Sequence, residues 1–238
     1  MPSLRLSPSD TLILIRQVSE NCEVTPQIDV EKHILSVYIN RVKCFDLRLP
    51  LPFPRLSSEE SLLSYCERLS IPPKPYSIIL IQAEYCALGF FDRGECLRHR
   101  ALRTYVVRRK RGKSQLTFSQ SGKKGSTSGS QLRYRNAVNF FEKIKETLNE
   151  WKTIEPSERI LYSCSINLWN FLFNGKTKCG FSKNDPRLFK IPLDVRIPNY
   201  DELRRINKLI SFGYISYDNA ELMYSSFHLN SVSIQKEP

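Results

Sequence analysis

The chain has 238 residues, of which 41% are hydrophobic and 25% charged, and its formal net charge is +12. These proportions are those of an ordinary globular protein that is long enough to bury a full core. The longest aliphatic runs, Ile78–Ile81 and Leu12–Ile15, are much shorter than the roughly 20 apolar residues that cross a membrane as a helix. Thr11–Ile15 is too short for the apolar core of a signal peptide. We therefore expect a cytoplasmic protein without a membrane-spanning segment.

Residues 1–74 are expected to form a small α+β extension whose role the sequence does not indicate. The predicted elements are strands at residues 34–39 and 42–47, and a helix from Ser57 or Ser58 to Leu69. Glu59 and Glu60 would lie in the first turn of this helix, where its dipole favours acidic side chains. Prolines in the stretch Ile71–Pro75 then stop the helix and mark a domain boundary.

The chain after this boundary is rich in predicted strands, followed by helices. Strands are expected at residues 76–82, 86–91, 95–99, 101–107 and 160–165, with a turn at 92–94 and another at 185–187. Helices are expected from Tyr134 to Trp151, where apolar residues recur at helical spacing, from about Leu168, and from Asn199 with Glu202 in the capping-box position. This order predicts an α/β fold with a central mixed sheet. We expect a catalytic domain at residues 75–212 and a C-terminal tail at 213–238.

The positive charge of the chain is concentrated in one segment. Residues 98–135 contain 12 Lys and Arg and no Asp or Glu, whereas the rest of the chain has 24 residues of each sign. Such a localised positive field indicates a polyanionic partner. A basic loop that binds nucleic acid without specificity remains the simplest alternative.

Motifs of common enzymes and metal sites are missing from the sequence. The seven cysteines are never closer than ten positions apart, which excludes CxxC motifs, and we expect them to be buried free thiols in a reducing compartment. No GxSxG, HExxH, Walker or GxGxxG pattern occurs. Asp92, Glu95 and Asp185 are better explained by turns than as metal ligands. We expect neither a metal nor a cofactor.

The stretch Lys110–Gln131 is a candidate functional loop. It holds four of the nine glycines and few large apolar residues, and a loop of this length in a compact domain is commonly functional or disordered. Gly112 allows the main chain to approach a ligand closely. Gln115 is neutral, with a donor and an acceptor, and can orient a water or a hydroxyl. The cations Arg108–Arg111 just upstream would hold phosphates.

Several motifs of this chain resemble those of the Vms-like release-factor domain of ribosome-associated quality control. The matching stretches, in order, are Tyr105–Gln115, Thr127–Gly129, Leu132–Asn136, Ile160–Ser163, Asp185–Leu188, Ile191–Pro192, Arg196–Pro198 and Glu202–Leu203. The resemblance covers roughly residues 76–211. That family is related to the central domain of archaeal and eukaryotic class I peptide-release factors.

The resemblance implies an RNase H-like α/β fold of the release-factor type, with a long loop that reaches the peptidyl-transferase centre. It implies that Gln115 is catalytic, that Gly112 and Ser114 shape the loop, and that peptidyl-tRNA and the large ribosomal subunit are the partners. The expected RNA-binding residues are Arg108, Arg109, Lys110, Arg111, Lys113, Lys123, Lys124, Arg133 and Arg135.

Three activities remain open for a chain of this kind. One is hydrolysis of the peptidyl-tRNA ester by a water that Gln115 positions. Another is endonucleolytic cleavage of the tRNA before its 3′ CCA, and a third is binding to the ribosome or tRNA without catalysis. The chain also departs from the family's pattern, because Lys113 replaces a second glycine and Arg133–Asn136 reads Arg-Tyr-Arg-Asn instead of Arg-Arg-Tyr-Asn.

Overall fold

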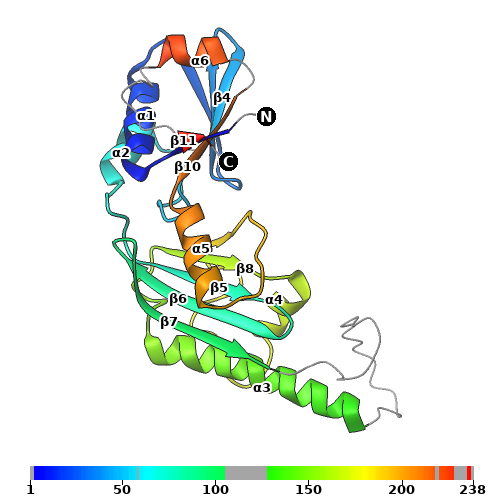
Figure 1. The fold of residues 1–238 in the computed structure, drawn as a ribbon. Helices are drawn as coiled ribbons and strands as arrows, with labels where there is room; N and C mark the ends of the chain where they lie inside the picture. The colour runs from blue at the N-terminus through cyan, green and yellow to red at the C-terminus, as the bar shows by residue number, and fades with distance from the viewer. Residues whose placement is uncertain (1–2, 58, 105–127, 218–219, 228–234, 237–238) are drawn as a thin grey trace. The chain divides into compact units, whose positions relative to one another are not determined.

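The computed structural model confirms an α/β protein with two sheets (Figure 1). It describes residues 3–57, 59–104, 128–217, 220–227 and 235–236. Contacts between Cα atoms divide the chain into two compact units. Unit 1 comprises residues 1–76, 92–95 and 205–238, and unit 2 comprises residues 77–91 and 96–204.

Unit 1 is built around a six-stranded sheet in the order β11-β1-β10-β4-β3-β2. Its strands are β1 (Ser3–Leu6), β2 (Val24–Asp29), β3 (Ile34–Ile39), β4 (Val42–Arg48), β10 (Gly213–Tyr217) and β11 (Gln235–Lys236). Each pair of neighbouring strands is antiparallel. Its helices are α1 (Pro8–Glu20), α2 (Leu62–Arg68) and α6 (Ala220–Ser226).

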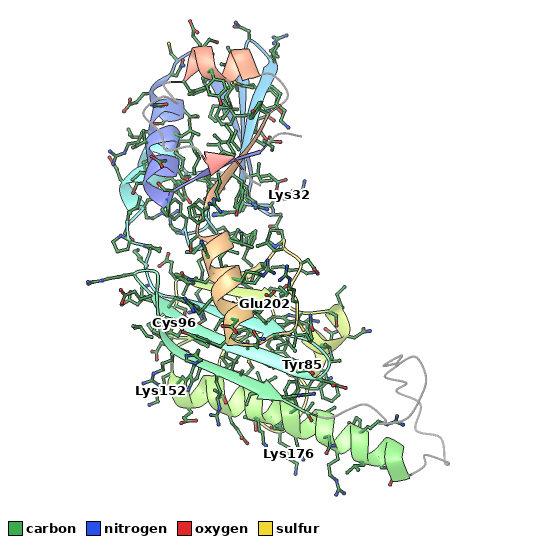
Figure 2. The ribbon with its side chains drawn as sticks, in the orientation of Figure 1. Lys32, Tyr85, Cys96, Lys152, Lys176 and Glu202 are labelled. Atoms are coloured by element: carbon green, nitrogen blue, oxygen red, sulfur yellow. The ribbon has the colours of Figure 1, made fainter. Side chains whose placement is uncertain are left out.

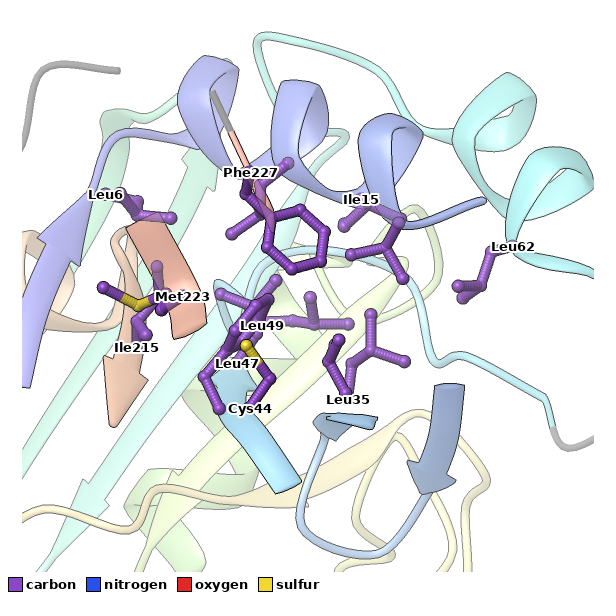
Figure 3. Packing of buried hydrophobic residues seen from close by; sticks show 14 of the residues in the cluster. Leu6, Ile15, Leu35, Cys44, Leu47, Leu49, Leu62, Ile215, Met223 and Phe227 are labelled. Atoms are coloured by element: carbon purple, nitrogen blue, oxygen red, sulfur yellow. The ribbon is translucent and has the colours of Figure 1, made fainter. Parts of the chain in front are cut away.

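The core of unit 1 follows from alternation along the strands. Leu35, Val37 and Ile39 are buried, and the residues between them are half-buried, as expected for a sheet with one covered face. Leu14 and Ile15 of α1 belong to the same apolar cluster (Figure 3). The predicted strands at 34–39 and 42–47 are therefore confirmed, with β4 extending one residue further.

The segment after residue 212, which was predicted to be a C-terminal tail, supplies a central strand of unit 1. β10 lies between β1 and β4, with Tyr214 opposite both Arg5 and Arg48. Ile215 is fully buried in the core of this unit. The pairing of β10 with strands near the N-terminus joins segments that are far apart in the sequence.

Two helices of unit 1 differ from the prediction. α2 begins at Leu62 instead of residue 57 or 58, because the Ser61 hydroxyl caps it by accepting a hydrogen bond from Ser64 N. Glu60 precedes the helix and pairs with Arg68. The 13-residue helix α1, with Ser7 as its N-cap, was not predicted, since its apolar stretch Thr11–Ile15 is short.

Unit 2 contains a five-stranded sheet in the order β7-β6-β5-β8-β9. Its strands are β5 (Tyr76–Ile81), β6 (Tyr85–Asp92), β7 (Glu95–Arg103), β8 (Arg159–Ser163) and β9 (Leu188–Lys190), and its helices are α3 (Ser128–Trp151), α4 (Ile166–Leu172) and the start of α5 (Tyr200–Ile210). The strands predicted at 95–99 and 101–107 join into one strand, β7, which ends at Arg103, and residues 105–107 lie outside the described residues. The short parallel strand β9 was not predicted. Arg93 and Gly94, both with positive φ, make the turn between β6 and β7.

Helix α3 packs its apolar stripe against one face of the unit 2 sheet. Phe141, Ile144 and Leu148 are buried in one cluster with Ile79 and Leu88 of the sheet, which confirms the predicted stripe. Tyr134 was predicted to belong to it but is 61% exposed. The helix begins six residues earlier than expected, at Ser128, so that its first turns extend beyond the apolar stripe.

A buried ion pair ties α3 to the loop that follows α4. The Lys145 ammonium is 2.6 Å from Glu142 Oε1 and donates to the carbonyl of Asn174 at 2.8 Å. Glu142 also accepts a hydrogen bond from Thr177 N. Gly175, at φ 110°, lies so close that a Cβ there would clash with Glu142 Oε1. This loop therefore needs both the charge pair and the glycine.

Lys145→Ala is expected to destabilise unit 2 by about 3 kcal/mol, because it leaves the Glu142 carboxylate and a carbonyl without their buried cation. The exposed Lys143, on the same helix, is the matched control, and Lys143→Ala should change stability by less than about 0.5 kcal/mol. Both tryptophans, Trp151 and Trp169, belong to unit 2, so urea unfolding followed by tryptophan fluorescence measures this unit. Equal losses in the two variants would contradict the role of the pair.

Candidate functional site

The candidate site is the segment that connects β7 to α3. We call residues 105–127 the basic segment. The predicted residues Gly112, Ser114, Gln115, Arg108, Arg109, Lys110, Arg111, Lys113, Lys123 and Lys124 lie outside the described residues. Their roles remain predictions. The structure does describe both flanks of the segment, which end at Thr104 and begin again at Ser128.

The flank formed by β7 is held to the sheet up to its last described residue. Thr104 N donates to the carbonyl of Glu84 at 2.9 Å. One residue earlier, the Arg103 guanidinium lies 5.0 Å from the centroid of the Tyr85 ring, at the start of β6 (Figure 2). The segment therefore leaves the sheet from a fixed point that carries an exposed cation.

The other flank, at the start of α3, contains the two predicted RNA-binding residues that the structure describes. Arg135 is exposed, and Arg133 is half-buried. Tyr134 between them meets the Phe171 ring edge to face, with centroids 6.3 Å apart, and Phe171 in turn packs on Phe141 at 4.9 Å. Aromatic contacts with α4 thus anchor the beginning of α3, and Arg135 is the more accessible of the two arginines.

Strand β7 carries three of the twelve cations of residues 98–135. Arg98, Arg100 and Arg103 are all exposed, and none of them was predicted individually to bind RNA. Because side chains alternate along a strand, Arg98 and Arg100 lie on one face of β7 and Arg103 lies on the other. The basic region of unit 2 therefore begins on an ordered edge strand.

The Asp185–Leu188 motif has a structural role in this protein. Arg187 donates to both carboxylate oxygens of Asp185, at 3.0 and 2.8 Å. It also donates to the carbonyls of Ile154 and Ser157, at 2.7 and 3.1 Å. Hydrogen bonding from Arg187 lowers the pKa of the Asp185 carboxyl below its ordinary value. This pair holds the connection after α3 against the start of β9.

The motif around Glu202 is likewise structural. Asn199 caps α5, since its side-chain oxygen accepts a hydrogen bond from Glu202 N at 2.8 Å, as predicted. The buried Glu202 carboxylate accepts from Arg196 N at 2.7 Å, which fixes the stretch before the helix; Figure 2 shows Glu202 on α5. Leu203, the next residue, packs closely against Gly89 of β6. A Cβ atom at position 89 would clash with the Leu203 side chain.

Buried thiols and acidic residues in the described structure do not form a reactive site. Burial raises the pKa of Cys164 to about 12 and raises that of Cys86 well above its ordinary value, so both favour the unreactive thiol. The described ranges hold no group of three or more His, Cys, Asp or Glu that could bind a metal ion. Among the helices they include, none is long and apolar enough to cross a membrane.

The match to a known family spans this whole site. Residues 76–217 match the family described as Bacteroidetes VLRF1 release factor. That stretch is more than half of the chain and includes β7, the basic segment and α3. The chain belongs to this family.

Relatives of this chain carry names that refer to tRNA. It is 28% identical over 167 residues to the human "tRNA endonuclease ANKZF1", a match that covers 68% of this chain and 23% of the relative. It is 26% identical over 157 residues to "tRNA endonuclease vms-1" of Caenorhabditis elegans, covering 63% of this chain and 25% of the relative. The chain thus spans about a quarter of the length of these relatives.

A solved structure has a fold similar to that of this chain. The structure titled "Vms1 mitochondrial localization core" aligns with a TM-score of 0.51 at 10% identity, covering 90% of this chain and 97% of that one. At this identity the likeness concerns the fold alone. It confirms that this chain has an α/β fold like that of a Vms1 structure, as the resemblance to the Vms-like family implied.

Asp185→Asn is expected to lower the stability of unit 2 by about 2 kcal/mol at neutral pH, because it removes the charge from a paired hydrogen bond. The pKa of Asp185 is lowered in the folded state, so its contribution is complete above about pH 5 and is lost as the pH falls below its ordinary value of 3.8. Urea unfolding at several pH values should therefore show the difference from the parent protein shrinking below that value. Glu146→Gln, at an exposed position on α3, is the control, and a difference independent of pH would refute the pairing.

Proposed function

We propose that this protein frees stalled nascent chains from tRNA on the large ribosomal subunit, and that Gln115 acts at the bond that is cut. The observation that carries the proposal is the family match over residues 76–217, which includes the basic segment with Gln115 at its centre. The proposed site of action is the cytoplasm. The described flanks support this role, because the end of β7 is bonded to the sheet and the start of α3 packs on α4.

Cleavage of the tRNA backbone before the 3′ CCA is the first candidate reaction. Relatives that match this chain over most of its length are named tRNA endonucleases. The charge pattern also favours a phosphodiester, because attack of a ribose hydroxyl on phosphorus builds up negative charge that nearby cations stabilise. Lys113 and Arg111 lie two and four positions from Gln115. In this reaction Gln115 would order the attacking hydroxyl beside its phosphate.

Hydrolysis of the peptidyl-tRNA ester is the second candidate, and the description of the family as a release factor favours it. Here Gln115 would position a water against the ester carbonyl, since its amide both donates and accepts hydrogen bonds without titrating. Gly112 and Ser114 would allow the backbone to approach the tRNA terminus. The cations would then serve to hold RNA, and the ribosome would supply much of the catalytic environment.

Gln115→Ala is expected to slow release of a labelled nascent chain from stalled large-subunit complexes by about 100-fold, the usual cost of removing one positioned polar group from a reaction centre. Gln120→Ala, in the same segment, is the matched control and should retain activity. Sequencing the 3′ ends of the product tRNA identifies the bond, because a missing CCA means backbone cleavage and an intact CCA means ester hydrolysis. Full activity of the Gln115→Ala variant would exclude the catalytic role proposed for Gln115. If the parent protein shows no turnover, the protein binds the ribosome or tRNA without catalysis.

The basic segment is expected to dominate the salt dependence of RNA binding. Replacing Arg108 and Arg109 by alanine should lower the slope of log K against log salt by up to about 1.5, since each phosphate contact contributes roughly 0.7 to 0.9. Titration of labelled tRNA at several salt concentrations gives this slope. The same double change at Lys176 and Lys183, exposed residues outside the segment, should leave the slope unchanged. Equal effects of the two pairs would argue against a localised contact.

A further inference from the structure

Strand β7 carries cations on two faces that meet different surroundings. Arg100 points toward α3, because its guanidinium is 3.4 Å from Thr147 Oγ1 and 3.8 Å from Glu150 Oε2. Side chains alternate along a strand, so His99 and Arg103 lie on the opposite face of the sheet. That face is the one against which the start of α5 packs, through Leu203.

On this second face, two groups of contacts involve aromatic rings and cationic side chains. The His99 ring lies on the Tyr200 ring with centroids 3.9 Å apart and an angle of 26° between their planes. The Arg204 guanidinium is 5.9 Å from the centroid of Tyr200, and that of Arg103 is 5.0 Å from the centroid of Tyr85. We call these five side chains, from β6, β7 and α5, the stacked surface.

The stacked surface is accessible, unlike the aromatic clusters of the core. His99, Arg103 and Arg204 are exposed, and Tyr200 is 38% exposed. The acidic Asp201 follows Tyr200 directly, but successive residues of a helix point about 100° apart around its axis. The surface therefore combines planar groups and positive charge, and the His99 and Tyr200 rings are already stacked on each other.

We propose that the stacked surface binds a single-stranded segment of RNA, as a second contact beside the basic segment. Unpaired bases stack on aromatic rings and guanidinium planes, while the cations neutralise phosphates. Groups that are already stacked lose less conformational entropy on binding than free side chains do. Arg103 immediately precedes the basic segment, so one RNA can reach both. The proposal rests on the proposed function for its choice of RNA as the partner.

Fluorescence anisotropy with labelled deacylated tRNA tests the proposal, using the full chain with Gln115→Ala so that no turnover interferes. Adding His99→Ala and Tyr200→Ala should weaken binding by about 10-fold or more, the usual cost of losing base stacking. Tyr200→Phe keeps the ring and should keep the affinity. Arg100→Ala removes one cation from the other face of the same strand and should change affinity by no more than about twofold.

A further variant covers the case in which the double change disturbs folding, which tryptophan fluorescence would reveal. Arg204→Glu alters an exposed side chain and should also weaken binding by about 10-fold, because it replaces attraction to phosphate by repulsion. Two other probes identify the source of the RNA. One probe is tRNA trimmed of its single-stranded 3′ end. If the variants and the parent protein bind this trimmed tRNA with equal affinity, the surface binds the 3′ end. The other probe is the purified large ribosomal subunit. If the variants bind it more weakly than the parent protein does, the stacked surface binds ribosomal RNA.

Unchanged RNA affinity in both the double variant and Arg204→Glu would overturn the proposal. A loss in Arg100→Ala as large as that in the double variant would also overturn it, because binding would then depend on charge alone. Variants that bind RNA normally but lose a protein partner would make the surface a protein-docking site instead. These outcomes concern affinity only, so they remain separate from failure of the proposed reaction, which the activity of the protein with native Gln115 measures.

Discussion

Burial of the apolar stripe of α3 on the unit 2 sheet is the contact on which the candidate site depends. Phe141, Ile144 and Leu148 lie in one cluster with residues of the sheet strands, and burying side chains of this size is worth roughly 2 kcal/mol each. The basic segment starts where β7 ends and finishes where α3 begins. Both flanks of the segment are therefore attached to this packed layer, and the entropic cost of joining two fixed ends rises only slowly with the length of the connection.

Polar clamps, rather than catalytic groups, account for several of the motifs that unit 2 shares with its family. Arg187 and Asp185 hold the connection after α3, and Glu202 holds the stretch before α5. These side chains satisfy backbone groups that strands and helices leave without partners. The described charged groups at these positions therefore act in positioning the sheet edges.

Charge and chemistry are assigned to different residues in the proposed mechanism. In this proposal the cations would supply long-range attraction to RNA, which depends on salt, whereas the neutral Gln115 would act only at short range. The stacked surface would add a contribution that depends on ring planes more than on charge. Such a division predicts that binding and turnover can be changed separately, which is uncommon where one charged group both binds and reacts.

The sequence by itself determined much of the local structure and the place of the candidate site. Strands β3 to β6 and helix α3 were predictable because alternation and helical spacing are local patterns, and the basic segment was visible as charge. Tertiary structure decided what depends on distant contacts. β10 joins unit 1 because its partners, β1 and β4, are near the other end of the chain. The short β9 exists through its pairing with β8, and Asp185 is a clamp because Arg187 can reach carbonyls of residues some 30 positions earlier. The two faces of β7 became distinct only when α3 covered one and the start of α5 met the other, since a strand's alternation does not reveal which neighbours each face will have.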